Sequence, residues 1–204
     1  AVAGAKWAEG MVVCVDGKEI RRKPAAKNRR RHVYIALNKP IGITCTTDTA
    51  DASNIVDFID HQERIFPIGR LDKDSEGLIL LTSNGDIVNR ILRAENNHEK
   101  EYLVGVNKPV TEEFLRTMAR GVHIHRQVTK PCKVSKLAKY GFRITLTQGL
   151  NRQIRLMSEA LGYKVVQLRR VRIINVKLGT LKPGAWRNLS DAELAGLLPD
   201  VKDW

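Results

Sequence analysis

The sequence predicts an α+β domain with a largely antiparallel mixed sheet and flanking helices. Many short β-prone segments alternate with a few amphipathic helical patterns, and most neighbouring segments are joined by short, hairpin-like turns. Hydrophobic residues make up 43% of the 204 residues, which is enough for a sizeable core. We expect this main domain to span residues 32–204.

The strands are expected where apolar or alternating residues run between turn residues. In residues 100–106 the alternation places Lys100, Tyr102 and Val104 on one face. The expected strands are residues 33–37, 65–68, 78–81, 100–106, 130–137, 142–147, 165–168 and 171–176.

The helices are expected where apolar residues recur three and four positions apart behind capping residues. Ser83 is expected to cap one helix and Thr111 another, which Gly121 ends. Asn151 is expected to begin a helix whose buried stripe includes Ile154. The expected helices are residues 55–59, the segment from 83 onward, 111–121, 151–161 and 190–198, the last with a Ser-Asp-Ala-Glu capping box.

Residues 1–31 are expected to lie outside the main domain. Residues 11–15 and 18–20 surround an Asp-Gly turn, so they predict a hairpin, although one too small to fold alone. A basic linker follows, in which seven of eleven residues carry positive charge. These cations are Arg21, Arg22, Lys23, Lys27, Arg29, Arg30 and Arg31.

The charge balance points to a polyanionic partner. The chain has 35 Lys and Arg against 22 Asp and Glu, a net charge of +13, which is typical of nucleic-acid binding, although a merely basic protein is the alternative. A second cationic group lies within structured sequence and is expected to line a surface groove. Its members are Arg152, Arg155, Lys164, Arg169, Arg170 and Arg172.

The remaining composition indicates a cytoplasmic protein. No apolar run approaches the length needed to span a bilayer, and residues 1–10 lack the apolar core of a secretory signal. Cys14, Cys45 and Cys132 are odd in number and far apart, which suits a reducing compartment better than a disulfide framework.

Residues 69–77, with the sequence GRLDKDSEG, form the first candidate site. Five of these nine residues are charged, and the segment lies between two expected strands, which would hold it rigidly. Asp72 lies beside cations that favour an ionised carboxylate, and such a group suits a nucleophile. A solvated polar turn is the alternative.

Two further segments could carry chemistry. Tyr102 could stack on a nucleobase, or it could be a core tyrosine with a hydrated hydroxyl. Residues 149–155 place Arg152 and Arg155 at a helix N-terminus, where they could bind phosphate, pair with a carboxylate or simply be solvated.

His123 and His125 make at most half of a metal site, so we expect no metal. The sequence also lacks the glycine-rich motifs that bind nucleotide cofactors, and we expect no cofactor.

Five motifs in order resemble those of the pseudouridine synthases, specifically the branch that modifies ribosomal RNA. The resemblance covers about residues 33–198. The motifs are LNKPIG at 37–42, GRLDKDSEGL at 69–78, KEYLV at 100–104, GLNRQIR at 149–155 and LKPGAWRNL at 181–189.

This resemblance implies an isomerase that converts a uridine in 23S ribosomal RNA to pseudouridine. Asp72 would be the nucleophile acting on a flipped-out base, Arg155 would pair with Asp72, and Tyr102 would pack on the uracil. The implied partner is structured RNA, such as a 23S stem-loop, and we expect a monomer without membrane, metal or cofactor. RNA contacts are expected from Arg70, Lys39, Lys73, Lys100, Arg152, Arg29, Arg30 and Arg31.

The N-terminus departs from the family pattern, and two other functions remain as alternatives. Family members usually begin with an S4 RNA-binding module, whereas residues 9–20 resemble its last hairpin, so residues 1–31 are expected to be a remnant of that module plus the linker.

A non-catalytic ribosomal RNA-binding or assembly factor would fit the charge equally well. A nucleoside glycosidase would need two carboxylates, for which Asp74 and Glu76 are available.

Overall fold

A computed structural model describes residues 13–15, 18–20, 32–92 and 98–198. It divides into two compact units, residues 1–31 and 32–204. In the first unit, strand β1 (Val13–Val15) pairs antiparallel with β2 (Lys18–Ile20), which confirms the expected hairpin. The basic linker, including Arg29, Arg30 and Arg31, lies outside the described residues. The origin of this unit in an S4-like module stays a prediction.

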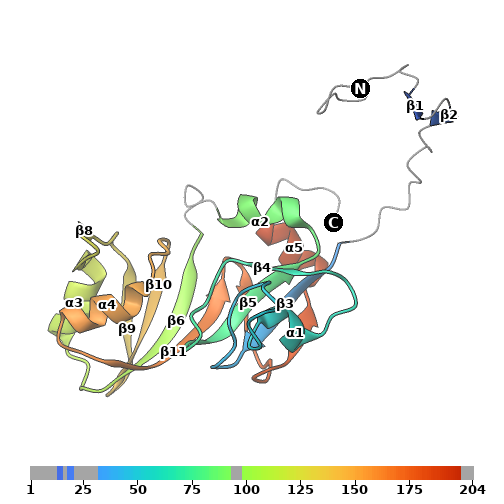
Figure 1. Cartoon of the computed structure of the whole chain (residues 1–204). Coiled ribbons are helices and arrows are strands. Elements are labelled where there is room, and N and C mark those ends of the chain that lie inside the picture. The colour runs from blue at the N-terminus through green and yellow to red at the C-terminus, as the bar shows by residue number, and fades with distance from the viewer. Residues whose placement is uncertain (1–12, 16–17, 21–31, 93–97, 199–204) are drawn as a thin grey trace. The chain divides into compact units, whose positions relative to one another are not determined.

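The second unit is built on a mixed sheet that has nine strands within the described residues (Figure 1). Along its main path the strand order is β13-β3-β5-β11-β6-β10-β9, with β4 beside β5 and β12 beside β11. The strands are β3 (Tyr34–Lys39), β4 (Phe66–Ile68), β5 (Glu76–Thr82), β6 (Lys100–Val106), β9 (Lys133–Ala138), β10 (Gly141–Leu146), β11 (Val165–Ile173), β12 (Val176–Lys177) and β13 (Trp186–Asn188).

Antiparallel pairing dominates this sheet, and β5 with β11 is its parallel pair. The predicted α+β class with a largely antiparallel sheet is therefore confirmed. A separate hairpin joins β7 (His123–Ile124) to β8 (Gln127–Val128). The two strands expected at residues 165–168 and 171–176 are instead mainly one strand, β11, whose register shifts between Arg170 and Arg172.

Helices flank the sheet close to the expected positions. They are α1 (Ile55–Ile59), α2 (Gly85–Leu92), α3 (Glu112–Arg120), α4 (Gln153–Ala160) and α5 (Asp191–Leu197). Thr111 caps α3 and Ser190 forms a capping box with Glu193, as predicted. Ser83 does not cap α2, because its hydroxyl accepts the Val33 N–H, and Asn84 accepts the Asp86 N–H instead.

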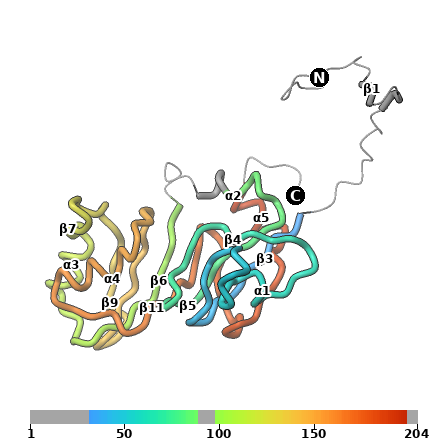
Figure 2. Tube along the Cα trace, viewed as in Figure 1, coloured from blue at the N-terminus to red at the C-terminus, as the bar shows by residue number. Residues whose placement is uncertain are grey.

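Buried apolar side chains form three clusters in the described part of the chain. The largest joins β6, β10 and β11 to α3 and α4, and includes Phe114, Phe142 and Met157. Figure 2 shows α3 and α4 together at the β6–β10–β9 end, with α1, α2 and α5 at the β3–β5 end. The β5–β11 pair therefore joins the two ends of the sheet.

Gly77 permits the close approach of β5 and β11. Its backbone has a φ of +108°, a conformation that residues with a side chain rarely adopt. A Cβ atom at this position would lie 2.3 Å from the carbonyl oxygen of Arg170 in β11. A residue with a side chain would separate the two strands, so the glycine fixes the start of β5 and the end of the loop that precedes it.

Candidate active site

The loop between β4 and β5 carries Asp72, and neighbouring backbone holds it on both sides. The Gly42 N–H donates to the carbonyl oxygen of Lys73 at 2.8 Å. The Cys45 thiol donates to the carbonyl oxygen of Leu71 at 3.2 Å and accepts the Leu71 N–H at 3.4 Å. Burial raises the pKa of Cys45, so the neutral thiol that makes these bonds is favoured. Hydrogen bonds to the backbone of Leu71 and Lys73 therefore hold the residues on both sides of Asp72 in place.

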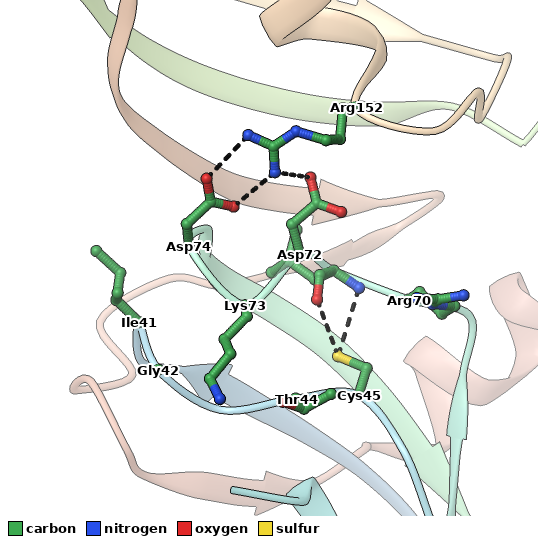
Figure 3. A pocket seen from close by; sticks show the side chains of 10 residues that line it. Ile41, Gly42, Thr44, Cys45, Arg70, Asp72, Lys73, Asp74 and Arg152 are labelled. Atoms are coloured by element: carbon green, nitrogen blue, oxygen red, sulfur yellow. Dashed lines mark hydrogen bonds and ion pairs between the residues drawn. The ribbon is translucent and has the colours of Figure 1, made fainter.

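A pocket of about 450 Å³ opens beside this loop (Figure 3). The side chain of Asp72 is 33% exposed there, which leaves the carboxylate accessible to a ligand. The segment that follows β3 forms the opposite wall. The lining residues are Ile41, Gly42, Thr44, Cys45, Arg70, Leu71, Asp72, Lys73, Asp74 and Arg152.

The two carboxylates of the loop differ in how firmly they are held. Arg152 donates two hydrogen bonds to Asp74, each 3.1 Å long, and these bonds hold the pKa of Asp74 below its usual value. The same guanidinium lies 3.7 Å from Asp72 Oδ2, an ion-pair distance rather than a hydrogen bond. The carboxylate of Asp72 accepts no hydrogen bond from any described residue. Asp72 is therefore the carboxylate that is available to a substrate.

The predicted pair of Arg155 with Asp72 is wrong. Arg155 Nη2 donates to the Asp74 carbonyl oxygen and to Ser75 Oγ, each at 3.0 Å, and lies 3.4 Å from Asp74 Oδ2. Arg152 takes the place next to Asp72 instead, because α4 begins at Gln153 rather than Asn151. Arg152 precedes the helix in a left-handed conformation, with φ 49°, and its side chain reaches both carboxylates. Arg155 is buried against the loop backbone.

Tyr102 lies on β6, opposite Arg170 of β11 and Ile144 of β10. Its ring is partly buried and packs at the margin of the largest core cluster, with the guanidinium carbon of Arg170 6.0 Å from the ring centroid. The ring therefore packs against the core, as one alternative predicted, and it also keeps an exposed portion, as base stacking would need. Stacking on a base stays a prediction.

The cations expected to contact RNA fall into different environments. Arg70 and Lys73 are exposed beside the pocket, and Lys73 donates to Ser53 Oγ. Lys100 is partly buried, which lowers its pKa, and it donates to the carbonyl oxygen of His98. For these residues and for Arg152, contact with RNA stays a prediction.

Lys39 was expected to contact RNA, and the structure contradicts this. Its side chain is 0% exposed, so it cannot reach a ligand on the surface. Its ammonium group donates to the carbonyl oxygens of Pro40 and Ile43, both at 2.9 Å, and thereby closes the turn that leads into the pocket wall. Burial lowers the pKa of Lys39.

The expected basic groove formed by the second group of cations is also wrong in part. Arg155 and Arg170 are buried rather than exposed. The strand pattern could have revealed this for Arg170, because it shares a face of β11 with the buried Leu168. Sequence reasoning also missed Cys45 as a support of the loop, and a single cysteine gives no such signal.

No group of three or more metal-binding side chains occurs within the described residues. His125 Nε2 lies 3.0 Å from the carbonyl oxygen of Asn151 and joins the β7–β8 turn to the segment before α4. The described part of the chain contains no helix that is both long and apolar enough to cross a bilayer.

The structure thus combines a mixed, largely antiparallel sheet with an accessible aspartate, in a pocket that is also lined by Arg70, Lys73 and Arg152. The sequence matches the RNA pseudouridylate synthase family over residues 33–160, and the chain belongs to this family. It is therefore an RNA pseudouridine synthase, an isomerase that acts on RNA.

Particular relatives place the chain within the family. It is 56% identical over 203 residues to the dual-specificity RNA pseudouridine synthase RluF of Escherichia coli K12, covering 100% of this chain and 69% of the relative. It is 35% identical over 169 residues to the ribosomal small subunit pseudouridine synthase A of Salmonella typhimurium, covering 80% and 73%. A crystal structure of a pseudouridylate synthase superposes with a TM-score of 0.77 at 36% identity, covering 82% and 74%. These relatives confirm the predicted resemblance to the ribosomal branch. Within that branch the sequence, including residues 97–102, resembles RluF, with RluB as the alternative, and the 56% identity over the chain supports RluF.

Proposed function

We propose that this enzyme converts a uridine of 23S ribosomal RNA to pseudouridine, with Asp72 as the nucleophile acting on a flipped-out base. The observation that carries the proposal is the state of Asp72, which faces the pocket without a hydrogen bond from any described residue. The resemblance of the five motifs implies 23S RNA as the substrate. The chain shares more of its sequence with the dual-specificity RNA pseudouridine synthase RluF than with the ribosomal small subunit pseudouridine synthase A.

The reaction requires the base to leave the RNA stack. Flipping costs a few kcal/mol, and phosphate contacts by surrounding cations offset this cost. Arg70, Lys73 and Arg152 are exposed at the pocket and could make such contacts. Within the pocket, the glycosidic bond from C1′ to N1 breaks, the base rotates, and C5 bonds to C1′. The proton leaves C5 and N1 gains one, so the RNA mass does not change.

A glycosidase reaction is less well supported by the carboxylates of the loop. Such an enzyme needs two carboxyl groups free to flank the bond. Arg152 holds Asp74, while Gln167 and Arg169 donate hydrogen bonds to Glu76 at 2.8 and 3.0 Å. Burial raises the pKa of Glu76, but these hydrogen bonds outweigh it, and the pKa lies below its usual value. Both groups therefore favour the ionised form, which cannot donate a proton.

The test compares Asp72→Asn with Asp60→Asn on transcribed 23S RNA. Asparagine is nearly isosteric with aspartate but is a poor nucleophile, so Asp72→Asn should bind RNA and form no pseudouridine in a single turnover. Asp60 is an exposed residue with φ 50°, a conformation that asparagine tolerates, so its variant should match the wild type. Substantial product from Asp72→Asn would remove Asp72 from the mechanism.

Product analysis separates the remaining alternatives. An isomerase leaves the RNA mass unchanged, whereas a glycosidase releases free uracil. A non-catalytic binding or assembly factor would do neither, although it would still bind RNA. Mapping pseudouridine in 23S RNA from cells with and without the protein would then identify the target uridine.

A further inference from the structure

Two buried arginines reach the Asp72 loop from different elements of the fold. Arg155 of α4 donates to the carbonyl oxygen of Asp74, two residues after Asp72. Arg170 of β11 donates from Nη1 to the carbonyl oxygen of Arg70, two residues before Asp72, at 3.3 Å. Asp72 therefore lies in the middle of a segment whose backbone is held on both sides by guanidinium groups.

Arg170 also connects this loop to the strand that follows it. Its Nε donates to the carbonyl oxygen of Leu78 in β5 at 2.7 Å, so one planar group bonds to both sides of the loop. The planar fork of arginine makes these two contacts from two different nitrogen atoms, Nε and Nη1, whereas a lysine at this position would have to make both from one nitrogen atom. The position of the loop relative to β5 is therefore set in part by this side chain.

The burial of Arg170 is energetically unfavourable. The residue is 3% exposed, its hydrogen bonds go to carbonyl oxygens, and it forms no ion pair with a carboxylate of any described residue. Its Nη2 atom is also buried without a hydrogen-bond partner in the described structure. A buried charge and an unsatisfied donor both destabilise a fold, and an apolar side chain would fill the same space at a lower cost. This cost indicates a role beyond packing.

The location of Arg170 suggests that role. It lies opposite Tyr102 in the pairing of β11 with β6, and its guanidinium carbon is 6.0 Å from the tyrosine ring centroid. On its other side, the backbone of Arg170 lies against Gly77 at the parallel pairing with β5. A single residue thus contacts the loop of the nucleophile, the strand after it and the ring expected at the base.

We propose that Arg170 is a positioning residue of the reaction, which fixes the Asp72 loop relative to Tyr102. The proposal rests on the function proposed above. A flipped base must meet the carboxylate and the ring together, and a misplacement of about 1 Å can slow a reaction on the order of 100-fold. Arg170 acts through the loop backbone and the ring, and it does not itself touch the substrate.

The test compares Arg170→Met, Arg170→Lys and the control Arg143→Met. Methionine fills similar space but makes neither backbone hydrogen bond, and Arg143 is a half-exposed residue of β10 that pairs with Glu101. Three quantities are measured: the single-turnover rate at saturating RNA, the RNA Kd, and amide hydrogen exchange of the full chain. Exchange in residues 70–77 reports on the loop, and exchange in α3 is the internal reference.

Arg170→Met should slow the single-turnover rate about 10- to 100-fold and change Kd less than about twofold. Exchange in residues 70–77 should rise about tenfold while that of α3 stays the same. Arg170→Lys keeps the charge and can reach one carbonyl oxygen, so it should lie between wild type and Arg170→Met. Arg143→Met should match the wild type.

A wild-type rate in Arg170→Met would overturn the proposal, as would a slow rate with unchanged loop exchange. Faster exchange in the loop and in α3 alike would mean that Arg170 serves general packing, which also overturns it. If Arg170→Met does not fold, Arg170→Lys decides by the same criteria. A wild-type protein that forms no pseudouridine would instead overturn the proposed function, and this outcome is separate because the exchange of the variants is measured without turnover.

Discussion

Replacing Arg152 with alanine tests the electrostatic environment of Asp72, the proposed nucleophile. The guanidinium lies 3.7 Å from Asp72 Oδ2. At this distance, Coulomb's law gives about 4 kcal/mol at an effective dielectric of about 20 and about 1 kcal/mol in water. The two side chains are 43% and 33% exposed, so solvent screening favours the lower part of this range, about 1–2 kcal/mol. We expect this contact to hold the carboxylate in position for attack, and its loss then corresponds to a roughly 5- to 30-fold lower rate.

Arg152→Ala should leave the protein folded, because its bonds to Asp74 lie at the surface and contribute about 1 kcal/mol or less. Arg155→Ala should differ: it removes buried hydrogen bonds to Asp74 and Ser75, so both stability and rate should fall. Arg152→Lys keeps one cation near Asp72 and should recover part of the rate.

The assay is the single-turnover rate at saturating RNA, with urea unfolding of each variant as the measure of stability. Saturation removes any loss of affinity from the comparison, so the rate reports the chemical step. If Arg152→Ala weakens RNA binding but reacts at the wild-type rate when saturated, the contact with Asp72 is incidental, and the reasoning from distance and exposure is refuted.

Three further predictions concern the fold, the pH dependence and the substrate. Gly77→Ala would place a side chain at a positive φ and against the backbone of Arg170, so it should lower the free energy of unfolding by about 2–5 kcal/mol. The control Gly85→Ala has open space around it and should change this free energy by less than about 1 kcal/mol. Equal effects of the two variants in urea melts would contradict the prediction. The pKa of Asp74 is depressed in the folded protein, so its ionised form stabilises the fold fully above the unfolded pKa of about 4, and this stabilisation is lost as the pH falls through the folded pKa. Asp74→Asn should therefore flatten the dependence of the free energy of unfolding on acidic pH in urea melts, and an unchanged dependence would contradict this. Neutralising residues 29–31 should reduce the slope of log Kd against log salt, and an unchanged slope would show that the linker does not touch RNA.

Several parts of the structure are encoded locally, and sequence patterns predicted them well. Strand β6 has the predicted bounds of residues 100–106, because a regular alternation of side chains defines it. The starts of α3 and α5 follow from Thr111 and Ser190, whose hydroxyl groups accept nearby backbone N–H groups. The loop of Asp72 was also predicted, since a dense run of charge between two apolar segments is itself a local signal.

Other elements depend on partners that are distant in the chain. Strand β13 was missed, because its three residues become a strand through pairing with β3, about 150 residues earlier. The parallel pairing of β5 with β11 has the same origin, since no local pattern specifies which strands become neighbours. The sequence predicted Lys39 to be a surface cation, but it is buried, and its ammonium group donates hydrogen bonds to the carbonyl oxygens of Pro40 and Ile43.

The sequence by itself determined the family, the fold class and the carboxylate that stands at the centre of the site. Tertiary structure decided which arginine faces it. Helical periodicity predicted Arg152 and Arg155 on one helix, but Arg152 precedes the helix with a left-handed backbone, and its side chain lies beside the carboxylates. Arg155 and Arg170 are instead buried and donate hydrogen bonds to the backbone of the loop. These contacts join residues about 80 to 100 positions apart. Their geometry depends on how the sheet brings β5, β11 and α4 together in space, and residue spacing along the chain does not predict the distances between these elements.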